Sequence, residues 1–78
     1  MKTEIRMPRL SPDMENGVLA CWLKNEGDEV KKGEPLFEVE TDKVVEQVEA
    51  VQDGRLEKLH AEEGDSVPVE SVIATLEV

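Results

Sequence analysis

Short apolar runs alternate with polar residues along the whole chain, and Gly, Asp, Asn or Pro closes most of them. This punctuation is typical of an all-β fold. The dipeptides Asn16-Gly17 and Asp53-Gly54 are the clearest hairpin-turn signals, because glycine accepts the positive φ angles that tight turns need. Gly27-Asp28 and Gly64-Asp65 form a second pair of turn signals.

The two halves of the chain repeat one another at a spacing of 37 residues. Residues 17–40 and 54–77 align without a gap and share 7 identities in 24 positions. The identical pairs are Gly17/Gly54, Leu19/Leu56, Glu26/Glu63, Gly27/Gly64, Asp28/Asp65, Val30/Val67 and Glu40/Glu77. Two copies predict two similar half-sheets that bury their apolar faces about a pseudo-two-fold axis. We therefore expect a small β-sandwich or flattened barrel, with half-repeats at about 1–40 and 41–78.

The repeat also orients the long apolar run of the first half, whose inward side alternation cannot settle. In the second copy Leu56 and Leu59 enclose two charged residues, so both leucines should face the core. By equivalence, Leu19 and Trp22 should point inward and Cys21 toward solvent. Leu19 and Trp22 are three residues apart and would lie on opposite faces of a regular strand, so we expect a bulge or a strong twist between them.

Composition narrows the functional classes. The 78 residues carry 9 basic and 19 acidic side chains, a net charge of −10, and they form one small domain over residues 1–78. This charge makes nucleic acid and membrane surfaces poor partners. Cys21 and His60 are the only cysteine and the only histidine, so neither a disulfide nor a zinc site is expected. With no signal-peptide-like run, we expect a cytoplasmic domain, monomeric in isolation.

Several conspicuous side chains are expected to have structural roles. His60 has no Cys or Ser partner nearby in the sequence, so a structural or surface histidine is expected rather than a general base. Met7 and Met14 should pack over one end of the core, and Glu62 and Glu63 should be solvated turn charges. No catalytic residue is therefore expected.

The segment between the two half-repeats is different. Residues 36–40 and 44–50 alternate as strands, and residues 41–43 join them without Gly or Pro. A tight hairpin with Lys43 at its tip is the simplest geometry.

Lys43 is the only basic residue between positions 33 and 54, a stretch that holds seven acidic residues. Such surroundings stabilise the protonated amine, so an enzyme would have to activate and modify this lysine. On turn chemistry alone, an ordinary exposed lysine, weakly paired with Asp42 or Glu40, is the simpler interpretation.

The stretch ETDKVV at 40–45, preceded by GDEVKKGEPLFEV at 27–39, closely resembles the lipoyl domains of 2-oxo acid dehydrogenase complexes, in the biotinyl/lipoyl-attachment family. The resemblance spans nearly the whole chain. It implies a flattened β-barrel of two four-stranded sheets, with the modified lysine at one end and both termini at the other. By position, Lys43 would carry lipoic acid in amide linkage. The residues recognised around it would be Glu40, Thr41, Asp42 and Val44.

The resemblance implies a carrier that is not itself an enzyme. The lipoyl arm would shuttle acyl groups and reducing equivalents among a thiamine-diphosphate-dependent 2-oxo acid decarboxylase, an acyltransferase domain and a dihydrolipoyl dehydrogenase. A lipoate ligase, or a lipoyl or octanoyl transferase, would attach it. MPRLSPDMENG at 7–17 resembles acyltransferase subunits of pyruvate or acetoin complexes, whereas Val44 is commoner in the 2-oxoglutarate branch. A dihydrolipoyl acetyltransferase of pyruvate dehydrogenase is therefore favoured.

Two alternatives remain open. A biotinyl carrier has the same fold, but methionines normally bracket its target lysine, so Asp42 and Val44 argue against biotin. An unmodified interaction or assembly module would merely expose Lys43, and a failure of lipoylation would favour it.

Glu46 departs from the family pattern, which is usually apolar at this position. It shares the expected inward face of its strand with Val44 and Val48. An unpaired buried carboxylate is costly. We therefore expect Glu46 to stay hydrated near the open, lysine-bearing end of the molecule.

Overall fold

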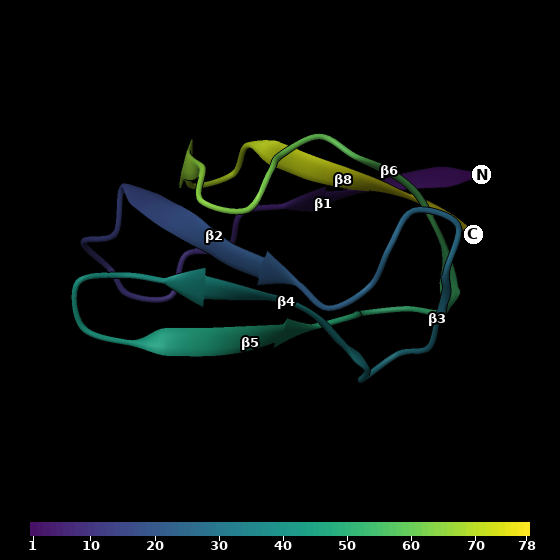
Figure 1. The fold of residues 1–78 in the computed structure, drawn as a ribbon, viewed down its shortest axis with the longest axis horizontal. Helices are drawn as coiled ribbons and strands as arrows, with labels where there is room; N and C mark the ends of the chain where they lie inside the picture. The colour runs from purple at the N-terminus through teal and green to yellow at the C-terminus, as the bar shows by residue number, and fades with distance from the viewer.

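Eight strands form the structure, a computed structural model that describes residues 1–78. They are β1 (Lys2–Arg6), β2 (Asn16–Trp22), β3 (Glu29–Val30), β4 (Pro35–Glu40), β5 (Val45–Glu49), β6 (Gly54–Leu59), β7 (Ser66–Pro68) and β8 (Val72–Glu77). They pair into two four-stranded antiparallel sheets, which confirms the expected all-β sandwich (Figure 1). The structure contains no helix that could span a membrane.

The two sheets have the symmetry that the repeat predicts. Their strand orders are β1-β8-β6-β3 and β5-β4-β2-β7. Each order changes into the other when every strand is replaced by its counterpart in the opposite half of the chain. Each sheet therefore contains two strands from each half, and neither half completes a sheet alone.

The turn at residues 25–28 of the first half holds a strand of the second half. The Gly27 N–H donates to the carbonyl oxygen of Leu56 at 2.7 Å. The Glu26 carboxylate accepts the N–H of Leu59 at 2.9 Å. These two hydrogen bonds, one donated and one accepted by the turn, fix it to β6.

The turn at residues 62–65 repeats these contacts in the opposite direction. The Gly64 N–H donates to the carbonyl oxygen of Leu19 at 2.7 Å. The Glu63 carboxylate accepts the N–H of Trp22 at 2.8 Å. Glu63 is an exposed turn charge, as expected, and its carboxylate also holds the end of β2.

The predicted irregularity of β2 is confirmed. Its pairing with β4 shifts register between Leu19 and Cys21, and the pairing of β6 with β8 shifts between Leu56 and Lys58. An extra residue at a bulge changes which face the following side chain occupies. Leu19 is accordingly fully buried and Trp22 packs against the core, while Cys21 is half-buried.

The expectation of hairpin turns at residues 16–17 and 53–54 is wrong. Gly17 lies within β2 and Gly54 opens β6, and neither has a positive φ. Space explains these glycines, because an added Cβ at position 54 would lie 2.7 Å from the carbonyl oxygen of Glu77. The other pair, Gly27 and Gly64, has φ of 93° and 95° and lies in turns as expected.

Thirteen apolar residues form a core between the sheets, and no charged or polar side chain is buried with them. They are Met7, Met14, Leu19, Val30, Leu36, Phe37, Val39, Ala50, Leu56, Val67, Ile73, Ala74 and Leu76. Met7 and Met14 come from the loop between β1 and β2, and both are buried as expected. An added Cβ at Gly17 would lie 2.7 Å from Met14 Cε and 2.9 Å from Val39 Cγ1. Gly17 therefore makes room for the loop to enter the core.

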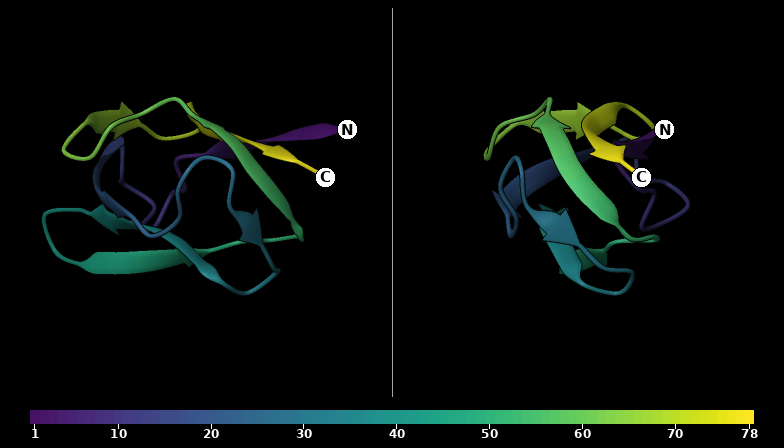
Figure 2. Two further views of the ribbon diagram at one scale, coloured as in Figure 1. Left: turned by 45° about the vertical axis from the view of Figure 1, so that its right-hand side comes forward. Right: turned by 90° about the vertical axis from the view of Figure 1, so that its right-hand side faces the viewer.

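Both chain termini lie at one end of the long axis, and the β4–β5 hairpin lies at the other (Figure 1 and the left panel of Figure 2). The principal extents are 32 × 20 × 20 Å. At the terminal end, the Val78 N–H donates to the carbonyl oxygen of Met1 at 2.8 Å. Nearby, Lys2 Nζ lies 2.8 Å from Glu57 Oε1, a hydrogen bond that raises the pKa of Lys2 and lowers the pKa of Glu57.

Glu63→Ala should lower the free energy of unfolding by about 1 kcal/mol, because the N–H of Trp22 loses a charged acceptor. Glu26→Ala should cost a similar amount by symmetry. Denaturant unfolding measures both. The matched control is Glu62→Ala, which removes a neighbouring carboxylate that makes no side-chain hydrogen bond or ion pair. An equal loss in the control would contradict the assigned role.

Gly17→Ala should lower the free energy of unfolding by about 1–3 kcal/mol through overpacking against Met14. Met14→Ala would also destabilise the core, but it removes the atom nearest to the new methyl group. The double variant should therefore lose clearly less stability than the sum of the single variants. Additive losses would show that the two positions do not compete for space.

Candidate functional site

Residues 41–44 form the turn that joins β4 to β5. The Thr41 N–H donates to the carbonyl oxygen of Val44 at 2.8 Å and closes the turn. Asp42 and Lys43 are its two central residues, so the expected position of Lys43 at the hairpin tip matches the structure. Neither has a positive φ, which explains why the turn contains no glycine. Val44 belongs to the turn, so β5 begins one residue later than the sequence pattern predicts.

The side chain of Thr41 folds back onto this turn. Its hydroxyl oxygen accepts the N–H groups of Lys43 and Val44, each at 3.3 Å. The hydroxyl also lies 3.4 Å from the carbonyl oxygen of Val44. Thr41 is half-buried, whereas Asp42, Lys43 and Val44 are exposed.

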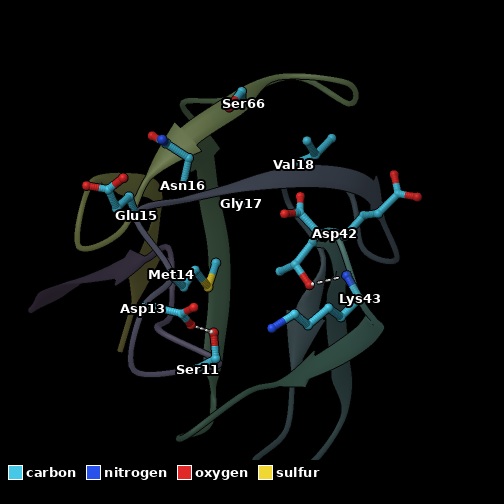
Figure 3. Close-up of a pocket in the computed structure, with 12 residues that line it drawn as sticks. Ser11, Asp13, Met14, Glu15, Asn16, Gly17, Val18, Asp42, Lys43 and Ser66 are labelled. Carbon is cyan, nitrogen blue, oxygen red and sulfur yellow. Dashed lines mark hydrogen bonds between the residues drawn. The ribbon is translucent and has the colours of Figure 1, made fainter.

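The Lys43 amine forms no ion pair. The ion pairs of the chain involve the N-terminus, Lys2, Arg6 and Lys24, so the suggested pairing of Lys43 with Asp42 or Glu40 is absent. The Lys43 side chain extends from the turn toward the β1–β2 loop (Figure 3). Its amine is thus displayed without a carboxylate holding it.

A polar cleft of about 490 Å³ separates this turn from the β1–β2 loop (Figure 3). Its lining residues are Ser11, Asp13, Met14, Glu15, Asn16, Gly17, Val18, Glu40, Thr41, Asp42, Lys43 and Ser66. Four of these residues are acidic and Lys43 is the one cation. Amide formation at Lys43 would remove that positive charge, and the only charged groups left along the cleft would be the four carboxylates. The sequence pattern missed this cleft, because residues 11–18 and 40–43 meet only in the folded chain.

The loop wall of the cleft is fixed by Met14. Its sulfur accepts the N–H of Leu10 at 3.2 Å, and its carbonyl oxygen accepts a hydrogen bond from Arg9 Nη1 at 2.6 Å. Because Met14 is also packed in the core, Ser11 and Asp13 are held beside the cleft. The Ser11 hydroxyl donates to the Asp13 carboxylate at 3.1 Å, which orders this wall further.

Glu46 is exposed, as expected. It lies opposite Val39 in the β4–β5 ladder, near the turn. The neighbouring Val44 and Val45 are also exposed, with 46% and 57% of their surfaces accessible. Val44 and Glu46 on the inward face are therefore open to solvent, and Val48 is the first side chain on that face to pack against the core.

Two other reactive side chains lie away from the turn and have structural partners. Partial burial raises the pKa of the Cys21 thiol, and the Glu38 carboxylate, 3.5 Å from the sulfur, raises it further. A thiol that stays protonated is a poor nucleophile. His60 Nε2 lies 2.8 Å from the Thr75 hydroxyl oxygen at the surface. No group of three or more His, Cys, Asp or Glu side chains could hold a metal ion.

Comparison with known proteins gives the family. Residues 3–76 match the sequence family Biotin_lipoyl, described as "Biotin-requiring enzyme". The chain is 51% identical over 77 residues to the pyruvate dehydrogenase E1 component subunit beta of Rhizobium meliloti, covering 97% of this chain and 17% of that protein. It is 49% identical over 77 residues to the dihydrolipoyllysine-residue acetyltransferase component of the pyruvate dehydrogenase complex of Rickettsia bellii, covering 97% of this chain and 18% of that protein.

A solved structure is similar as well. The lipoyl domain of the 2-oxoglutarate dehydrogenase complex from Azotobacter vinelandii superposes with a TM-score of 0.78 at 34% identity, covering 94% of this chain and 92% of that one. The chain spans less than a fifth of these curated relatives, at 17% and 18% of their lengths. The chain therefore belongs to the biotin/lipoyl-attachment family, whose lipoyl members are non-catalytic domains that carry lipoic acid covalently on a lysine.

Proposed function

We propose that this chain is a covalent lipoyl carrier with lipoic acid amide-linked to Nζ of Lys43. The observation that carries the proposal is the display of Lys43: an exposed lysine without an ion pair, at the tip of the hairpin farthest from the termini. We assign the surrounding Glu40, Asp42 and Val44 to recognition, because all three are exposed beside the lysine.

The turn fits the attached group. Amide formation requires the amine to enter the active site of an attaching enzyme, a lipoate ligase or a lipoyl or octanoyl transferase. A protruding two-residue tip with a free amine allows this approach, because no side chain must move away from Nζ. When bound, the lipoyl group supplies a dithiolane that accepts and releases acyl groups and electrons. The chain displays that group and adds no catalytic residue of its own.

The shape of the domain supports shuttling. Lys43 and the termini lie at opposite ends of a molecule that is 32 Å long, so a tether at either terminus leaves the lysine free to sweep outward. Tethering keeps a carried group at an effective concentration of about the millimolar range near each partner. The partners would be a thiamine-diphosphate-dependent 2-oxo acid decarboxylase, an acyltransferase domain and dihydrolipoyl dehydrogenase.

We place the carrier in a pyruvate dehydrogenase complex of the cytoplasm, as part of a dihydrolipoyl acetyltransferase. The relative from Rickettsia bellii, named as that component, supports the assignment at 49% identity. The free Cys21 agrees with a reducing compartment. A second candidate for the parent chain is a decarboxylase subunit, because the relative from Rhizobium meliloti, 51% identical, is named as an E1 subunit beta.

Co-expression with a lipoate ligase in the presence of lipoate should add one lipoyl group to the chain, on the peptide that contains Lys43. Intact mass and peptide mapping measure the addition. Lys43→Arg should abolish it, whereas the control Lys58→Arg, at another exposed lysine, should leave it unchanged. A parallel arm with biotin ligase and biotin tests the biotinyl alternative. An unmodified chain beside a working positive-control domain would favour an interaction module.

Asp42→Lys or Glu40→Lys should slow reductive acylation of the lipoylated chain by the decarboxylase, and the loss should be larger at low salt. The acidic residues at the tip would attract a basic entrance on the decarboxylase and so speed the encounter. Salt screens this long-range attraction. The control is Glu29→Lys, the same charge change in β3, away from the hairpin (Figure 1). The rate of reductive acylation of each variant, measured over a series of salt concentrations, tests for electrostatic steering. A loss of rate that does not vary with salt would count against steering.

A further inference from the structure

Thr41 differs from the other residues around Lys43 in the direction of its side chain. Its hydroxyl oxygen accepts both the Lys43 and the Val44 N–H, and the dashed line that ends at the Lys43 nitrogen in Figure 3 marks the first of these bonds. The Asp42 carboxylate makes no hydrogen bond, and the Val44 side chain has no polar atom that could make one. Thr41 is also the half-buried member of the turn. Its hydroxyl is thus occupied with the backbone of the turn itself.

We propose that Thr41 is a positioning residue for the modification of Lys43. Its hydroxyl fixes the backbone of the lysine, so that Nζ projects from the tip in the one direction that the attaching enzyme accepts. The residue acts through Lys43 and not through a contact of its own with that enzyme. This inference rests on the proposed lipoyl attachment at Lys43.

The geometry explains why the hydroxyl is needed. No glycine or proline restricts the two central residues of the turn, so the chain has few local constraints there. The closing bond from the Thr41 N–H to the Val44 oxygen joins the ends of the turn but leaves the Lys43 N–H without a backbone acceptor. The threonine hydroxyl supplies that acceptor, as serine and threonine do in turns of this kind.

The length of these bonds sets the expected effect. At 3.3 Å each they are long for N–H···O bonds, and water can replace the hydroxyl at an exposed turn. Losing the hydroxyl should therefore leave the sandwich folded but let the turn sample other conformations. If about a tenth of the molecules keep the competent turn, the apparent affinity for the attaching enzyme falls about tenfold.

Thr41→Val removes the hydroxyl and keeps the size and branching of the side chain, and Thr41→Ser keeps the hydroxyl. Lipoate ligase assays on the intact unmodified chain should give a KM for Thr41→Val about tenfold above the native value with kcat unchanged. Thr41→Ser should restore the native KM. Thr3→Val, in β1 near the termini, is the matched control because that threonine side chain makes no hydrogen bond.

A second measurement uses the free protein. The NMR couplings between the amide and α protons of Asp42 and Lys43 report their φ angles. In Thr41→Val these couplings should move toward conformational averaging before any enzyme is added, and Thr41→Ser should restore them. Far-ultraviolet circular dichroism and thermal unfolding establish that each variant is folded.

The outcomes separate the inference from the proposed function. A native KM in Thr41→Val would overturn the positioning role. A raised KM with unchanged couplings would overturn it too, because the hydroxyl would then contact the enzyme directly. A failure of the native chain to accept lipoate would overturn the proposed function and the inference with it.

Discussion

The fold depends on the carboxylates of Glu26 and Glu63, each of which satisfies a strand of the other half. The short strands β7 and β3 pair only with the first residues of β2 and β6, so N–H groups farther along those two edges need other acceptors. On these two edges the acceptors are the two carboxylates, 2.9 Å from the Leu59 nitrogen and 2.8 Å from the Trp22 nitrogen. Both glutamates are among the identities of the 37-residue repeat. The repeat therefore preserves the contacts that hold the halves together.

This exchange of turns also places the candidate site. The last strand of the first half, β4, pairs with the first strand of the second half, β5, so the link between the halves joins two paired strands. The link is a short turn at the end of the sandwich, and Lys43 lies in it. The loop that faces this turn is fixed independently, since Met14 is buried in the core beside Gly17. The pairing of β4 with β5 fixes one wall of the cleft and the burial of Met14 fixes the other. The Lys43 side chain extends between these two walls.

The sequence predicts those features that local pattern determines. Alternation and the repeat indicate the all-β fold, the bulge near Trp22 and the hairpin that carries Lys43. The turn predicted at Gly17 was wrong because the sequence does not show whether a glycine is needed for a positive φ or for space. Only the packing of the β1–β2 loop shows that Gly17 is needed for space. The hydrogen bond that Glu63 accepts could not be predicted, because its donor, Trp22, lies 41 residues away. The direction of the Thr41 hydroxyl likewise depends on the folded turn.

The pairing of the chain ends has a consequence for topology. Val78 donates its N–H to the Met1 oxygen at 2.8 Å, and Thr41 makes the same bond to Val44 at 2.8 Å in the symmetry-related position. The termini therefore stand where a two-residue turn would stand in a closed chain. Joining Val78 to Met1 through two residues would produce a ring with two equivalent tips. The fold therefore does not require the termini to lie at this end of the molecule. The chain could begin and end at either of the two equivalent tips, and the other tip would be the turn that can display a lysine.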